Sequence, residues 1–138
     1  MRRILAFSMV MAAVLAACSK GEGDTGEGDK GTCGPTPTAV AQVPNLPSGF
    51  AVPEGVSITS VSKAGPSTIV EGSFEGDLDA AFEAFKDGFE NAGFDVTRSE
   101  QEEDDAEVNF SGANTTGQVK LSVPCEGRVG ITITIRPA

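Results

Sequence analysis

The side chains that could do chemistry in this sequence are carboxylates and cysteines, because the chain contains no histidine. One short stretch collects six acids: Glu100, Glu102, Glu103, Asp104, Asp105 and Glu107. Carboxylate oxygens are the ligands that calcium prefers, so this stretch could bind calcium weakly. It lacks the Asp-x-Asp-x-Asp-Gly spacing of a calcium loop, however, and a run of like charges usually forms a solvated loop. We therefore expect residues 100–107 to form a solvated loop between two strands, without a bound metal or cofactor.

No combination of nucleophile and base in the sequence is typical of an enzyme. Without histidine, the chain lacks the commonest general base and the commonest transition-metal ligand. No serine stands in a nucleophile-elbow pattern, and the glycine-rich stretches lack the Lys-Ser/Thr pair of a phosphate-binding loop. Tryptophan and tyrosine, which are enriched at binding hot spots, are absent as well. We predict that the protein has no catalytic residues and is not an enzyme; a weak hydrolase has no motif to support it.

The first 18 residues are organised like a targeting signal. Arg2 and Arg3 precede an apolar run of 14 residues, which is shorter than the roughly 20 needed to span a bilayer. The run ends in Leu15-Ala16-Ala17-Cys18, which resembles the bacterial lipobox: Leu, a small residue, Ala or Gly, then Cys. The alternative is an ordinary secretory signal in which Cys18 is incidental.

The lipobox resemblance implies that residues 1–17 are a lipoprotein signal peptide and that the Cys18 sulfur receives a diacylglyceryl group. In many bacteria the amine freed by cleavage is acylated as well. Two or three acyl chains hold a protein lastingly at a membrane, whereas one binds marginally. In a source with two membranes, Ser19 at the next position implies the outer membrane. We expect an extracytoplasmic protein that is attached to a membrane through its lipid.

Residues 18–53 are predicted to comprise the lipidated cysteine, a flexible tether and an extended lead-in. The tether, residues 19–32, is rich in glycine and acids and repeats Gly-Glu-Gly-Asp at 21–24 and 26–29. The lead-in, residues 35–53, contains five prolines, which favour an extended path outside the core. Once Cys18 is lipidated, Cys33 and Cys125 remain, and in an oxidising compartment two such thiols suggest a disulfide. Free thiols are the alternative.

The regular hydrophobic pattern predicts one domain over residues 54–138. Two β-type runs, 56–61 and 67–74, predict a hairpin. Asp77 is a plausible N-cap for a helix whose apolar residues fall on one face. Gly93 suits the left-handed conformation that caps the C-terminal end of such a helix. Four further runs predict strands: 94–97, 106–111, 118–123 and 129–136. The order β-β-α-β-β-β-β indicates an α+β fold, with one amphipathic helix on a mostly antiparallel sheet.

The join from helix to strand, Ala92-Gly93-Phe94-Asp95-Val96, is similar to that in small extracytoplasmic domains of bacterial lipoproteins that lack an assigned function. The resemblance supports the fold and transfers no site. The formal net charge is −10, which disfavours nucleic acids and anionic headgroups as partners. We expect a non-enzymatic interaction module that acts on an unknown protein or ligand of the cell envelope. The alternative is a carrier that shields a small apolar ligand or lipid between helix and sheet.

Overall fold

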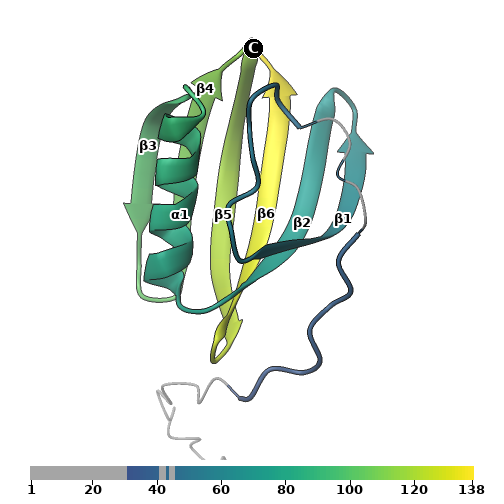
Figure 1. Ribbon diagram of the computed structural model, residues 1–138, viewed down its shortest axis with the longest axis vertical. Helices are drawn as coiled ribbons and strands as arrows, with labels where there is room; N and C mark the ends of the chain where they lie inside the picture. The colour runs from purple at the N-terminus through teal and green to yellow at the C-terminus, as the bar shows by residue number, and fades with distance from the viewer. Residues whose placement is uncertain (1–30, 41–42, 44–45) are drawn as a thin grey trace, which may run out of the picture.

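The structure is a computed structural model that describes residues 31–40, 43 and 46–138 (Figure 1). The expected signal peptide, Cys18 and the tether up to residue 30 lie outside the described residues. Two strands precede the helix and four follow it. Their bounds are β1 Val56–Ala64, β2 Ser67–Glu75, α1 Leu78–Asn91, β3 Asp95–Gln101, β4 Asp105–Gly112, β5 Thr115–Cys125 and β6 Arg128–Pro137.

All six strands form one antiparallel sheet with the order β1-β2-β6-β5-β4-β3. Helix α1 packs on one face, over β3, β4 and β5 (Figure 1). The predicted α+β class, with one helix on an antiparallel sheet, is therefore confirmed. In the central strand β6, isoleucines and valines that are at most 7 % exposed alternate with less buried residues, as the sequence pattern predicts.

Helix α1 begins and ends where the capping residues predict. The Ala80 N–H donates to the Asp77 side chain at 2.8 Å, which satisfies one of the free donors of the first turn. At the other end, Gly93 has a φ of 80°, which favours glycine, and the chain turns into β3. The buried face of the helix consists of Leu78, Ala81, Phe82, Phe85 and Phe89.

Phenylalanine rings fill the space between the helix and the sheet. The Phe89 ring stacks on Phe110 of β4 with centroids 4.0 Å apart, and on Phe50 at 4.8 Å. Phe94 meets the same group edge-on, at 5.7 Å from Phe110. Gly117 on β5 makes room for this stack, since a side chain there would collide with the Phe110 ring.

Phe50 belongs to the lead-in, which the sequence places outside the core. Only 8 % of Phe50 is exposed, and Val43, Leu46 and Val52 pack against the core as well. Residues 46–53 cross the same face of the sheet as α1, beside the helix (Figure 1). The folded unit therefore includes side chains that come before the expected boundary at residue 54, and the lead-in covers the part of the sheet that α1 leaves open.

The β4–β5 turn has two residues with positive φ, Ala113 at 50° and Asn114 at 56°. This backbone matches the twist of a two-residue hairpin. Together with the β1–β2 turn and the end of β6 it forms one end of the sheet, which we call the distal pole. The opposite end, which carries the β5–β6 turn and the β3–β4 turn, we call the tether pole (Figure 1).

Candidate functional site

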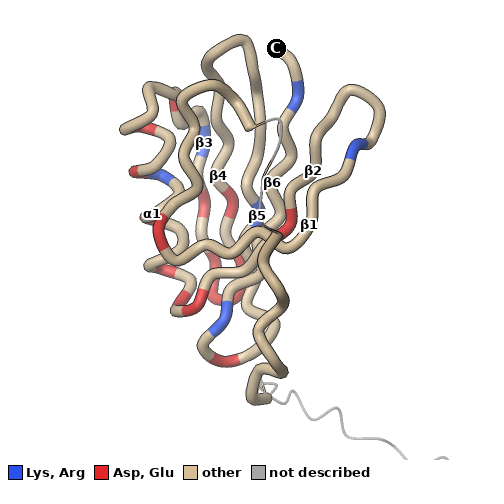
Figure 2. Tube along the Cα trace, turned by 45° about the vertical axis from the view of Figure 1, so that its right-hand side comes forward, with Lys and Arg blue, Asp and Glu red and all other residues tan. Residues whose placement is uncertain are grey.

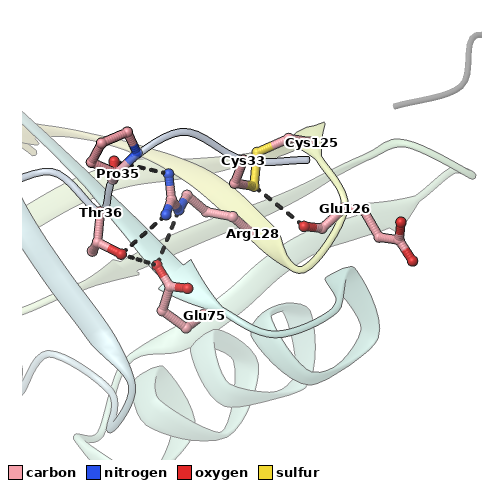
Figure 3. Close-up of a disulfide and its surroundings, with 7 residues drawn as sticks. All are labelled: Cys33, Pro35, Thr36, Glu75, Cys125, Glu126 and Arg128. Atoms are coloured by element: carbon pink, nitrogen blue, oxygen red, sulfur yellow. Dashed lines mark hydrogen bonds and ion pairs between the residues drawn. A yellow bond between two sulfur atoms is a disulfide. The ribbon is translucent and has the colours of Figure 1, made fainter. Parts of the chain in front are cut away.

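A disulfide joins Cys33 to Cys125 at the tether pole, as the sequence suggests (Figure 3). The two Cα atoms are 5.2 Å apart and the residues are separated by 92 positions. Thr32 forms a parallel bridge with Glu126, and the Cys33 sulfur lies 3.3 Å from the Glu126 carbonyl oxygen. The chain at Thr32 and Cys33 is thus fixed covalently beside the β5–β6 turn.

Arg128 makes a second attachment of the lead-in at this pole (Figure 3). It opens β6 and lies directly opposite Glu75, the last residue of β2. Its Nε donates to Glu75 Oε1 at 3.0 Å, its Nη2 to Thr36 Oγ1 at 3.0 Å and its Nη1 to the Pro35 carbonyl at 3.4 Å. The Arg128 side chain is only 12 % exposed. One guanidinium therefore holds two strands and two lead-in residues together.

Along the chain, the lead-in runs first over the outer face of the sheet, which is the side away from α1. It then runs over the inner face, which is the side that carries α1. Arg128 and Glu75 alternate with the core residues Val129 and Phe74, so their side chains leave the sheet on the side away from α1. The Val40 N–H then donates to the Ile58 carbonyl of the edge strand β1 at 2.7 Å. Phe50, further along, lies in the core on the helix side. The lead-in consequently passes around the β1 edge and caps part of it.

The rest of the outer face is polar and is covered by no described element. Its middle carries Gln118 and Lys120 on β5, both of which contact Glu107 on β4, at 2.8 and 3.0 Å respectively. Exposed pairs of this kind contribute about 1 kcal/mol or less each. Among the residues that the structure describes, Val40 is the only exposed large hydrophobic side chain.

The acidic stretch is not the single loop that the sequence predicts. Strand β3 runs to Gln101 and β4 starts at Asp105, so only residues 102–104 form the turn. The outward-facing positions of paired strands tolerate charge, and Glu100 and Glu107 are direct partners there. Glu100 accepts from Arg98 at 2.7 Å, which raises the pKa of the guanidinium above its ordinary value.

The acids of this stretch line an open depression of about 130 Å³, formed by Glu100, Glu102, Asp105, Ala106 and Glu107. No group of three or more acidic or cysteine side chains in the described part of the chain is arranged to hold a metal ion.

The acids are also unevenly distributed over the domain. Residues 77–107 contain twelve acids against two bases, whereas the other described residues contain four of each. Figure 2 shows the acids gathered along α1, β3 and β4. We call residues 77–107 the acidic flank.

Two further depressions lie elsewhere on the surface. One, of about 410 Å³, separates the lead-in near Pro53 from the small residues Ala84 and Gly88 of α1. The other, of about 240 Å³, lies at the distal pole and is lined by Lys63, Pro66, Thr68, Asn114, Thr115, Ile135, Arg136 and Pro137. The sequence gives no sign of the distal pocket, because its residues come from four separate segments.

The sequence matches no family model, and it shows no significant similarity to a curated protein or a solved structure. Within the described residues, no helix is both long enough and apolar enough to cross a membrane. A structural disulfide is compatible with an oxidising compartment outside the cytoplasm.

Proposed function

We propose that the protein is a lipoprotein of the bacterial cell envelope, in which acylated Cys18 anchors a non-enzymatic binding module to a membrane. The observation that carries the proposal is a lipobox-like Leu15–Cys18 followed, after 14 intervening residues, by a cysteine bonded to the folded domain. A flexible chain of that length has a root-mean-square reach of roughly 20 Å. In a source with two membranes, Ser19 favours the outer one.

The disulfide gives the anchored module a preferred orientation. The tether joins the domain at Cys33, so the tether pole is the end nearest the membrane and the distal pole is the end furthest from it. Strands of about ten residues separate the two poles by roughly 30 Å. A partner in the envelope would therefore meet the distal pole and the uncovered outer face first.

Charge supports the same orientation. The turn Glu102–Asp104 lies at the tether pole, where it adds to the acids of the tether itself. Bilayers with anionic lipids repel such groups over about one Debye length, roughly 8 Å at physiological salt. Repulsion at this end keeps the domain off the bilayer and leaves its other surfaces accessible.

The alternative role as a carrier of an apolar ligand has less support. The space between helix and sheet, where such a ligand would lie, is filled by the stacked rings of Phe50, Phe89 and Phe110. All three residues are at most 8 % exposed. Native mass spectrometry of the protein purified from membranes distinguishes the roles, because a stoichiometric co-purifying lipid would favour the carrier.

Lipid attachment can be tested by metabolic labelling with an alkyne fatty acid in a bacterial host. The full chain is compared with Cys18→Ser and with Cys33→Ser, a matched cysteine control at a position that should not be acylated. We expect label and membrane association for the full chain and for the control, and neither for Cys18→Ser. Label that persists in Cys18→Ser would refute the anchor.

The binding role can be tested with a photo-crosslinking residue at Thr132, in the middle of the uncovered outer face. The same residue at Asp87, on the helix, serves as the positional control. A discrete adduct from Thr132 in intact cells, lost in the Cys18→Ser chain, supports an anchored module. Equal adducts from both positions indicate non-specific collision and contradict the proposal.

A further inference from the structure

The two edges of the sheet differ in what covers them. The lead-in passes the β1 edge, where the Val40 N–H donates to the Ile58 carbonyl. Strand β3 forms the other edge, and among the described residues only those of β4 form hydrogen bonds with its backbone. Six of the seven residues of β3 are exposed. This edge is therefore open to solvent along its length (Figure 1).

The register of the β3–β4 pair shows which backbone groups of β3 are free. The Glu102 N–H donates to the Asp105 carbonyl at 2.8 Å, so these two residues at the turn form a hydrogen-bonded pair. Opposed residues of antiparallel strands alternate between bonded and non-bonded pairs, which makes Glu100 the next residue bonded to β4. The residues on either side of it, Ser99 and Gln101, therefore direct their N–H and C=O groups away from β4.

The open edge is a template for strand addition, but a short one. The register of β3 against β4 shifts between Val96 and Arg98, and such a bulge twists an edge away from further pairing. The regular part of the edge is Arg98–Gln101. An added strand would lie about 4.8 Å from β3 and bond to the free groups of Ser99 and Gln101. So few backbone bonds give a low affinity, and the surrounding side chains must select the partner.

Acidic side chains border this edge on the helix side. The Gln101 side chain donates to Asp79, which places the first turn of α1 beside the end of β3. Glu83 and Glu90 follow Asp79 at helical spacing on the same side of α1, and the helix runs alongside β3 (Figure 1). The opposite side of the helix, which includes Ala84, borders the lead-in instead.

Acids border the edge on the outer face as well, where Glu100 and Glu107 are direct partners. The two bases of the acidic flank are already paired. Arg98 contacts Glu100 at 2.7 Å, and Lys86 contacts Glu83 at 3.2 Å. With twelve acids against these two bases, the surroundings of the edge remain strongly negative (Figure 2).

We infer that β3 binds, by strand addition, a short extended segment of another protein that is rich in lysine and arginine. The backbone of the segment pairs with Ser99 and Gln101, and its alternating side chains reach the acids on both sides of the edge. A second copy of this chain fits poorly, because edge-to-edge pairing would bring two acidic flanks together. The edge adjoins the uncovered outer face. Its role as the binding surface of an anchored module rests on the proposed function, whereas the open edge and its charge do not.

The test is binding of a synthetic peptide, acetyl-Lys-Thr-Lys-Thr-Lys-Thr-amide, to the full chain labelled with ¹⁵N. We expect saturable amide shifts along β3 and α1. Hydrogen exchange of the Ser99 and Gln101 amides should become slower, because the peptide supplies the acceptors that these N–H groups lack. A peptide with glutamate in place of lysine should not bind. Absence of binding by the lysine peptide, or binding that leaves the two amides unprotected, would overturn the inference.

A second peptide separates strand addition from general attraction between opposite charges. It keeps the three lysines but carries N-methyl groups on its backbone nitrogens, which removes the donors and blocks the approach of a strand. The affinity should fall roughly tenfold, since each lost backbone hydrogen bond weakens binding several-fold. Equal affinity of the two lysine peptides would show that only charge attracts them, and would contradict strand addition.

Variants of the protein locate the charge that matters. Glu90→Gln/Glu102→Gln removes two acids that border β3 and should weaken binding of the lysine peptide several-fold. The matched control is Glu54→Gln/Glu126→Gln, which removes two acids outside the acidic flank and should leave the affinity unchanged. Equal losses in both double variants would indicate attraction to the net charge of the protein and count against the edge.

Sedimentation of the full chain without peptide tests a second copy as the occupant. We expect no dimer that pairs through β3. A dimer in which the Ser99 and Gln101 amides are already protected would assign the edge to a second copy and overturn the inference. Loss of peptide binding with normal labelling at Cys18 would count against this surface alone, and the reverse against the anchor alone.

Discussion

Removal of the Cys33–Cys125 disulfide should lower the free energy of unfolding by about 4–5 kcal/mol. The bond closes a loop with a sequence separation of 92, and the chain-entropy relation gives about 4.6 kcal/mol for that length. A domain of this size is stabilised by roughly 5–15 kcal/mol in total. The bond would thus account for a large part of the stability, although strain or residual structure in the unfolded chain reduces the gain in practice.

Urea denaturation of the double variant Cys33→Ser/Cys125→Ser, compared with the full chain, measures this loss. With a slope of about 1–3 kcal/mol per molar urea, the midpoint should fall by roughly 1.5–4.5 M. The slope itself should rise, because an unfolded chain without the cross-link exposes more surface. The double variant should still fold at low urea, since Arg128 and Phe50 continue to hold the lead-in.

The reduced full chain is the control for the serine side chains, and the two should agree within about 1 kcal/mol. A loss below about 1 kcal/mol with an unchanged slope would refute the reasoning. It would mean that the loop is already restricted in the unfolded state, so that closing it covalently changes little.

Four other substitutions test the contacts that build the fold. Phe89→Ala should cost about 3–5 kcal/mol in urea denaturation, because it empties the centre of the ring stack. Asp77→Ala should cost about 1 kcal/mol by the same assay, through loss of the bond to the Ala80 N–H. Ala113→Gly should stabilise by about 0.5 kcal/mol, since it relieves a left-handed backbone at φ 50°; a loss of stability would contradict this. Arg128→Gln should speed hydrogen exchange of the Val40 amide at least several-fold while exchange in β6 stays slow, and uniform acceleration would indicate global destabilisation instead.

The helix and strands whose apolar residues repeat at a regular spacing were predictable from the sequence, and the segments without such a repeat were not. The apolar stripe of α1 between Asp77 and Gly93 repeats at helical spacing, and β6 alternates along its length, so both were found with nearly their observed bounds. Phe50 has no such pattern around it. A single aromatic residue among prolines gives no signal that it reaches the core, because its burial depends on a path around the edge of β1.

The candidate sites, too, could be predicted from the sequence only in part. A run of acids predicts a loop by composition, but the neighbours Ala106 and Val108 face the core and hold the chain in a strand. The pairing of Arg128 with Glu75 depends on strand register. Strands β2 and β6 are far apart in the sequence, and the period of each strand alone does not show that they are neighbours in the sheet.

If the protein is anchored through Cys18, as proposed, the position of the disulfide within the sheet has a mechanical consequence. A pull on the tether reaches Cys33 first, and the covalent bond passes it to Cys125 at the end of β5, a strand flanked on both sides by β4 and β6. Without that bond, the same pull would run along the lead-in, through the contacts of Arg128 and the bond from Val40, to Phe50 in the core. Those contacts are individually worth about 1–2 kcal/mol and would open one after another. In an anchored chain the bond would therefore protect the part of the core that the lead-in supplies.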